Sequence, residues 1–207
     1  MDPRPDDPIL PFATSAAFDR WLAAHHAKAA VVWIKYAKKG SGEPSITLTE
    51  AVDVALCHGW IDGQSKALDE RYYLQRFTPR RPASTWSKIN RDRVARLIAE
   101  GRMRPAGLAE VDRAKADGRW DAAYDSPRTA VVPDDLTRAL ARRPAAKAAF
   151  ATLSATNRFT ILHRLQVAKQ PQTRARRIEA IVTKLEAEEA QPPAKRKVTR
   201  PVAKARR

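Results

Sequence analysis

The stretch from Ala55 to Asn90 constrains the fold of this chain more than any other segment. Within it, the side chains of residues 71–77 alternate with the period of two that a β-strand requires. A short turn separates this run from residues 61–67, so the two runs predict a β-hairpin. A third run, VVWIKY at residues 31–36, is β-branched and aromatic, as strands usually are. We therefore expect a small antiparallel or mixed three-stranded sheet.

Helices are predicted before and after the hairpin in the sequence. Thr47 and Glu50 have the spacing of a capping box, which marks a helix start. Ser84 and Ser87 offer caps for a second helix that runs through Glu100. From Pro133 onward, apolar residues recur with helical spacing in four short segments, which is typical of a small bundle. The predicted fold class is therefore α+β, a small sheet flanked by helices, with a helical C-terminal module.

The length of 207 residues suits one generous domain or a core with an appendage. Prolines and aspartates crowd the first residues, whereas the last residues are basic and proline-containing. Both compositions disfavour a packed core. We expect a flexible N-terminal arm, an α+β core domain, a helical C-terminal module and a disordered basic tail, at residues 1–13, 14–130, 131–189 and 190–207.

Several classes of protein are disfavoured by the sequence. The single cysteine, Cys57, rules out an internal disulfide and a cysteine-based zinc site. The N-terminus lacks the basic start and apolar run of a signal peptide, and no stretch approaches the ~18 apolar residues of a membrane span. We therefore expect a cytoplasmic protein without a membrane span. No catalytic motif, metal-ligand cluster or dinucleotide fingerprint is recognisable, so we expect no metal and no cofactor, and enzymatic activity stays open.

A dense group of basic side chains follows the hairpin. Residues 76–104 contain nine Lys or Arg and two acids. Arg80 and Arg81 stand between two prolines, just before a helix start whose free N–H groups and hydroxyls favour anions. Nearby tryptophan rings offer stacking surfaces. We predict a site for a phosphate- or carboxylate-bearing small molecule formed by Trp60, Asp62, Arg76, Arg80, Arg81, Ser84, Trp86 and Ser87. The alternative is a helix with a solvated basic face and tryptophans in the core.

Asp62 is the best candidate acid in this segment. In an apolar setting its pKa would rise, and the carboxylate would act as the base of a hydrolase-like enzyme. The alternative is a salt bridge with Arg80 or Arg81 that holds the proline-flanked link in place.

Nucleic acid is the alternative partner. The net charge is +16 and the pI is about 10.5, and residues 191–207 hold seven Lys or Arg and no acid. Such charge favours anionic partners, and a basic extension of this kind binds nucleic acid without sequence preference. The candidate contacts combine the basic face after the hairpin with the tail: Lys88, Arg91, Arg93, Lys195, Arg196 and Lys197.

Several long motifs resemble those of the YdeI/OmpD-associated (bacteriocin-protection) family. They are EAVDVALCHGWIDGQ, the pattern YxxRFTPRRPxSxWSKxN from Tyr73 to Asn90, GRMxPAGL, AKADGRWDAAY, and PDDLTRAL…KAAFATLS…TRARRI. The resemblance extends over roughly residues 18–186. It implies a bacterial protein with a role in protection against bacteriocins or envelope stress, and it implies no reaction, cofactor or catalytic residue. The oligomeric state is left open.

Overall fold

The computed structural model describes residues 2–168 and 170–189. The chain divides into two compact units, residues 1–124 and residues 125–207. Each unit has its own hydrophobic core, and the two are described separately below. The predicted basic tail, 190–207, lies outside the described residues.

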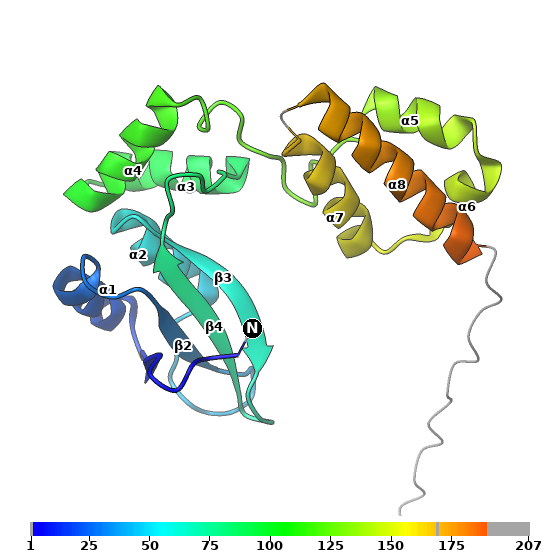
Figure 1. The fold of residues 1–207 in the computed structure, drawn as a ribbon. Helices are drawn as coiled ribbons and strands as arrows, with labels where there is room; N and C mark the ends of the chain where they lie inside the picture. The colour runs from blue at the N-terminus through cyan, green and yellow to red at the C-terminus, as the bar shows by residue number, and fades with distance from the viewer. Residues whose placement is uncertain (1, 169, 190–207) are drawn as a thin grey trace, which may run out of the picture. The chain divides into compact units, whose positions relative to one another are not determined.

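The first unit contains a mixed sheet of four strands in the order β1-β2-β4-β3 (Figure 1). Strands β3 (Trp60–Ala67) and β4 (Tyr72–Pro79) form the predicted antiparallel hairpin, and β2 (Val32–Ala37) pairs antiparallel with β4. The α+β fold class is confirmed, and of the two predicted sheet types, antiparallel or mixed, the sheet is mixed.

The sheet has one strand more than the three predicted. Strand β1 (Ile9–Pro11) pairs in parallel with β2 at the edge of the sheet, and the Trp33 N–H donates to the carbonyl of Pro8. Proline is tolerated at a sheet edge, where its missing N–H faces no partner strand. Only three residues take part, so the segment shows no period that sequence analysis detects.

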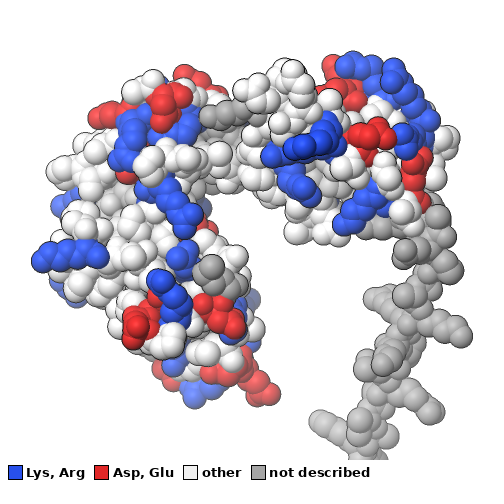
Figure 2. All heavy atoms as spheres, viewed as in Figure 1, with Lys and Arg blue, Asp and Glu red and all other residues white. Residues whose placement is uncertain are grey.

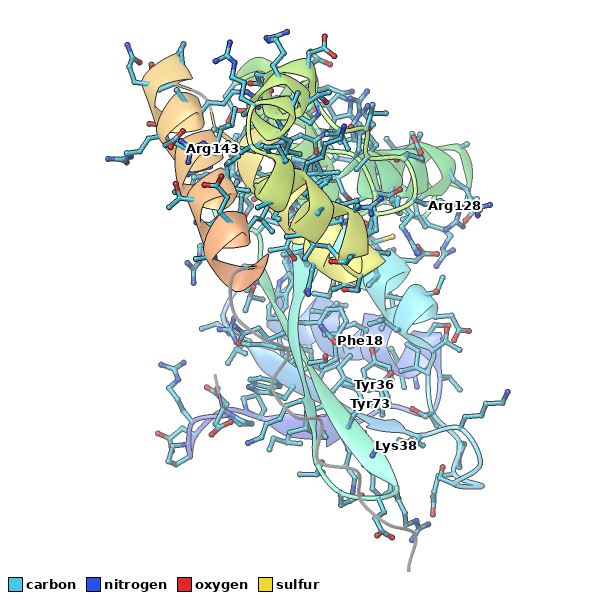
Figure 3. The ribbon with its side chains drawn as sticks, turned by 90° about the vertical axis from the view of Figure 1, so that its right-hand side faces the viewer. Phe18, Tyr36, Lys38, Tyr73, Arg128 and Arg143 are labelled. Carbon is cyan, nitrogen blue, oxygen red and sulfur yellow. The ribbon has the colours of Figure 1, made fainter. Side chains whose placement is uncertain are left out.

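Four helices share one hydrophobic core with this sheet. They are α1 (Ser15–His25), α2 (Leu48–Cys57), α3 (Lys88–Ala99) and α4 (Pro105–Ala116). The capping box at Thr47 and Glu50 is present at the start of α2. Figure 3 labels Phe18 of α1 together with Tyr36 and Tyr73, whose rings stack with centroids 5.0 Å apart. The buried residues of this layer form one continuous core.

Helices α2 and α4 approach each other closely at Gly107. A Cβ atom built on Gly107 would lie 2.3 Å from the carbonyl oxygen of Cys57 and 2.7 Å from that of Leu56. The absence of a side chain therefore sets the spacing of these two helices.

The opposite face of the sheet carries a small apolar cluster of Val31, Trp33 and Leu74. The N-terminal segment joins this face through Asp7, whose carboxylate accepts a hydrogen bond of 3.2 Å from the Trp33 indole. Arg76 pairs with Trp33 in the register of β2 and β4, so its side chain leaves the sheet on this same face.

The second unit is the predicted helical module. Its helices are α5 (Asp134–Ala141), α6 (Pro144–Thr152), α7 (Ala155–Gln166) and α8 (Pro171–Glu189). Leucine, isoleucine, valine, alanine and phenylalanine side chains, contributed by all four helices together, make its core. Arg143, labelled in Figure 3, donates hydrogen bonds to Glu179 and Glu186 of α8 and so joins the α5–α6 turn to the last helix.

Candidate anion-binding site

A cavity of about 590 Å³ lies in the first unit beside the end of strand β4. Four arginines and a single acid stand among the residues around it, and the rest are small, hydroxyl-bearing or proline. The lining residues are Arg4, Asp7, Ala30, Arg76, Thr78, Pro79, Arg80, Arg81 and Pro82. Three of the predicted site residues, Arg76, Arg80 and Arg81, therefore share this cavity.

The backbone holds these three arginines in place. Arg76 lies within β4, and Pro79 fixes the φ angle at the end of the strand. The Arg80 N–H donates to the Gly59 carbonyl at 2.9 Å, and the Arg81 N–H donates to Ser84 Oγ at 2.9 Å. The cavity wall is therefore made by a strand end and a hydrogen-bonded link.

The guanidinium groups of these arginines have few partners. The Nε atoms of Arg76 and Arg80 are both buried and have no hydrogen-bond partner among the described residues. Arg80 uses Nη2 to donate to the Thr85 carbonyl at 2.7 Å. Within the described part of the chain, no carboxylate lies within 4.0 Å of the side-chain nitrogens of Arg76, Arg80 or Arg81.

Arg80 is the most deeply placed of the three. Its side chain is only 5% exposed, and its guanidinium lies 3.7 Å from the ring centroid of Trp86. Burial lowers the pKa of Arg80 to about 10, although Glu110 and Tyr124 act in the opposite direction. The group stays charged at neutral pH, so the first unit maintains a buried cation that forms no salt bridge with a carboxylate among the described residues.

The acid that lines the cavity is already engaged. Asp7 accepts hydrogen bonds from the backbone N–H of Arg4 at 3.1 Å and from its Nε at 3.2 Å. The backbone hydrogen bond from Arg4 lowers the pKa of Asp7, and the Trp33 indole adds to this effect. Asp7 therefore balances the charge of Arg4 and is not the salt-bridge partner of the other three arginines that line the cavity.

The remaining predicted site residues lie elsewhere. Trp60 and Trp86 are both 1% exposed, and the Trp60 indole donates to the His26 carbonyl. Ser87 is the N-cap of α3, and the backbone of that helix start also pairs with Tyr124. Ser84 accepts from the Arg81 N–H. Arg80 and Arg81 thus contact Trp86 and Ser84, but Trp60, Ser84, Trp86 and Ser87 are not among the residues that line the cavity.

Asp62 lies on β3 opposite Phe77, a core residue, and is not among the residues lining the cavity. Burial raises its pKa, against the weaker attraction of Arg93 and Arg80. Among the described residues, Asp62 forms no salt bridge with Arg80 or Arg81. The carboxylate thus has the raised pKa that an apolar setting predicts, without the ion pair that we considered as the alternative.

The basic face of α3 is largely engaged within the first unit. Arg93 and Arg96 both donate to Asp53 of α2, and Arg91 donates to the Trp120 carbonyl. Figure 2 shows basic and acidic side chains side by side over α3 and α4. Lys88 stands exposed at the first turn of α3 and has an interaction of its own. Lys195, Arg196 and Lys197 lie outside the described residues.

Sequence analysis missed the contribution of the N-terminal segment. Arg4 and Asp7 line the cavity, yet they fall in the stretch that we expected to be a flexible arm. Only the pairing of β1 with β2 brings them to the end of β4, and a three-residue edge strand leaves no periodic signal.

A second cluster of titratable groups joins α1 to the end of α2. His58 Nε2 lies 2.8 Å from Asp19 Oδ1, and Arg104 donates to Asp19 Oδ2 at 3.1 Å. Burial lowers the pKa of His58 despite the neighbouring carboxylate. Burial opposes the ionisation of Asp19, but the hydrogen bond with His58 and the charge of Arg104 still lower its pKa.

The described residues contain no group of three or more His, Cys, Asp or Glu side chains arranged to hold a metal ion. None of the helices in the described ranges is long and apolar enough to cross a membrane.

Comparison with protein families divides the chain in the same way as its two cores. A family model described as Domain of unknown function (DUF8412) matches residues 10–110. Searches of curated proteins and of solved structures found no significant match. A family model described as Bacteriocin-protection, YdeI or OmpD-Associated matches residues 129–188. The resemblance that we expected over residues 18–186 is therefore found over residues 129–188, within the helical second unit, whereas residues 10–110 match a different family model.

Proposed function

We propose that the protein binds a small anionic ligand in the cavity beside β4, and that it does so as a protection protein of the YdeI/OmpD-associated type. The observation that carries this proposal is the set of three arginines, Arg76, Arg80 and Arg81, which line one cavity without a carboxylate partner in the described part of the chain. The family signature of the second unit supports the protective role.

The physical argument rests on the cost of unpaired charge. A buried N–H group without a partner costs about 1–3 kcal/mol, and more when the group is charged. Arg76 and Arg80 each bury such a group at Nε. Both arginines line the cavity, and hydrogen bonds between guanidinium and oxyanion are among the strongest in proteins.

The nucleic-acid alternative has less support from the described residues. Arg91 and Arg93 already donate to protein oxygens, so a strand of nucleic acid would have to compete with Asp53 and the Trp120 carbonyl. For the hydrolase-like alternative, Asp62 has the pKa shift of a base but does not line the arginine cavity.

Tryptophan fluorescence during anion titration tests the proposal. All five tryptophans lie within residues 1–124, and one of them, Trp86, stacks on Arg80. We expect a saturable change with phosphate, sulfate or acetate at constant ionic strength, and a weaker response in Arg76→Gln and Arg81→Gln. Arg20→Gln, an exposed arginine away from the cavity, removes the same charge and serves as the control. Equal responses from all variants, or none from the wild type, would refute anion binding at this site.

A further inference from the structure

We infer that the ligand of this cavity carries a terminal phosphoryl group with two negative charges, as a phosphate monoester does. This inference rests on the proposed anion-binding function and narrows its chemical class. It is argued from the balance of charge around the cavity, from the placement of the donors and from the surroundings of the site.

Charge balance favours a dianion. Asp7 is held by Arg4, and among the described residues no carboxylate forms a salt bridge with Arg76, Arg80 or Arg81, although Glu110 and Asp62 act on Arg80 from a longer distance. A monocarboxylate would leave two of these cations without a counter-charge. A dianion leaves one, and Arg81 is exposed enough for water to solvate the remaining charge.

The placement of the donors favours a group with three terminal oxygens. Arg76 and Arg80 are four residues apart and both line the cavity, whereas Arg81 reaches it from the link that follows. Thr78 lies between them and adds a hydroxyl to the lining. A carboxylate has two oxygens for these separate donors, whereas a phosphate monoester has three strong acceptor oxygens.

The surroundings favour a small molecule over a nucleic-acid backbone. Each phosphodiester carries one charge, and a strand needs a row of free cations to follow. The neighbouring arginines of α3 are engaged instead: Arg93 and Arg96 with Asp53, and Arg91 with the Trp120 carbonyl.

A matched pair of ligands tests the inference on the full chain. Methyl phosphate carries two charges at about pH 8, because the second pKa of a phosphate monoester is about 6, whereas dimethyl phosphate carries one charge at any such pH. Titration is followed by tryptophan fluorescence at constant ionic strength. We expect methyl phosphate to bind at least about tenfold more tightly than dimethyl phosphate or acetate, as the loss of one charge-assisted contact predicts.

Variants locate the binding. Arg76→Lys keeps the charge but removes the guanidinium Nε, and we expect it to weaken methyl phosphate binding by about tenfold, with Arg20→Gln unchanged. Unaltered fluorescence of the ligand-free variant verifies that the fold is kept. An Arg76→Lys variant that binds methyl phosphate as well as the wild type would overturn the assignment of the phosphoryl group to Arg76.

The outcomes separate the two proposals. If dimethyl phosphate and acetate bind as tightly as methyl phosphate, the inference of a dianion is overturned, although anion binding stands. If none of these anions binds, both proposals fail. If methyl phosphate fails and a short single-stranded oligonucleotide binds with a steep salt dependence, the inference is overturned in favour of the nucleic-acid alternative.

Discussion

Replacing Gly107 with alanine should push helices α2 and α4 apart and destabilise the first unit. The new methyl group would lie 2.3 Å from the Cys57 carbonyl oxygen and 2.7 Å from the Leu56 carbonyl oxygen. Ordinary contacts of a Cβ atom begin near 3.4 Å, so the two helix backbones must separate by about 1 Å. Both opposing atoms belong to the backbone of α2, so no side-chain rotation relieves the clash.

The size of the effect follows from two opposing contributions. Alanine is favoured over glycine in a helix by up to about 1 kcal/mol. Overpacking a tightly packed core costs about 1–3 kcal/mol, and sometimes more. Because the clash at Gly107 is with rigid backbone, we expect the upper end of this range and a net loss of about 2 kcal/mol in the free energy of unfolding.

Urea unfolding followed by tryptophan fluorescence measures this loss, since all five tryptophans lie in residues 1–124. With a urea dependence of about 2 kcal/mol per M, the midpoint should fall by about 1 M. Gly63→Ala is the control, because its Cβ would lie 3.7 Å from the Arg76 carbonyl oxygen, an ordinary contact. A Gly107→Ala midpoint at or above that of the wild type would show that the close approach of α2 and α4 does not limit stability.

Three further predictions concern ion pairs, pH and the two units. Asp53→Asn should lower the free energy of unfolding by about 1–3 kcal/mol, because it weakens the buried acceptor shared by two arginines of α3. Glu100→Gln, which removes a surface charge, should change the free energy of unfolding little. Equal urea unfolding midpoints for the two variants would contradict this prediction. Because the pKa of His58 is lowered in the folded state, the unfolded chain binds a proton at this residue at a higher pH than the folded chain does, and stability should fall as pH drops below about 6.5. His58→Gln should lose part of this pH dependence between about pH 7.5 and 5.5. An unchanged slope of stability against pH in this variant would refute the assignment to His58. Residues 1–124 alone should unfold cooperatively by tryptophan fluorescence, and a gradual loss of signal would show that the first unit needs the second.

Local patterns predicted the regular elements well. The alternation over residues 71–77 indicated the hairpin, and the spacing of Thr47 and Glu50 indicated the start of α2. Both signals depend on residues close together in the chain, whose geometry follows from strand and helix periodicity. Strand β1 escaped this reasoning because its stability comes from β2, which lies some twenty residues further along the chain.

The candidate site, like the fold, was predictable where the signal is local and not where it depends on long-range contacts. The proline-flanked arginines at residues 80 and 81 stood out in the sequence, and the structure places both in one cavity with Arg76. The tryptophans near them are core residues, because a large aromatic ring contributes most when it is fully buried. Composition alone does not distinguish a ring that stacks on a ligand from one that stacks on an arginine, as Trp86 does on Arg80.

The sequence by itself thus determined the α+β class, the hairpin, the helical second unit and the concentration of positive charge after β4. These properties follow from the periodicity and composition of short segments. Only the tertiary structure decided which cations pair with acids and which do not: Arg93 is paired with Asp53, whereas Arg76 and Arg80 face a cavity. Pairing depends on atoms that long-range contacts bring within a few ångströms of each other, and no local pattern encodes that distance.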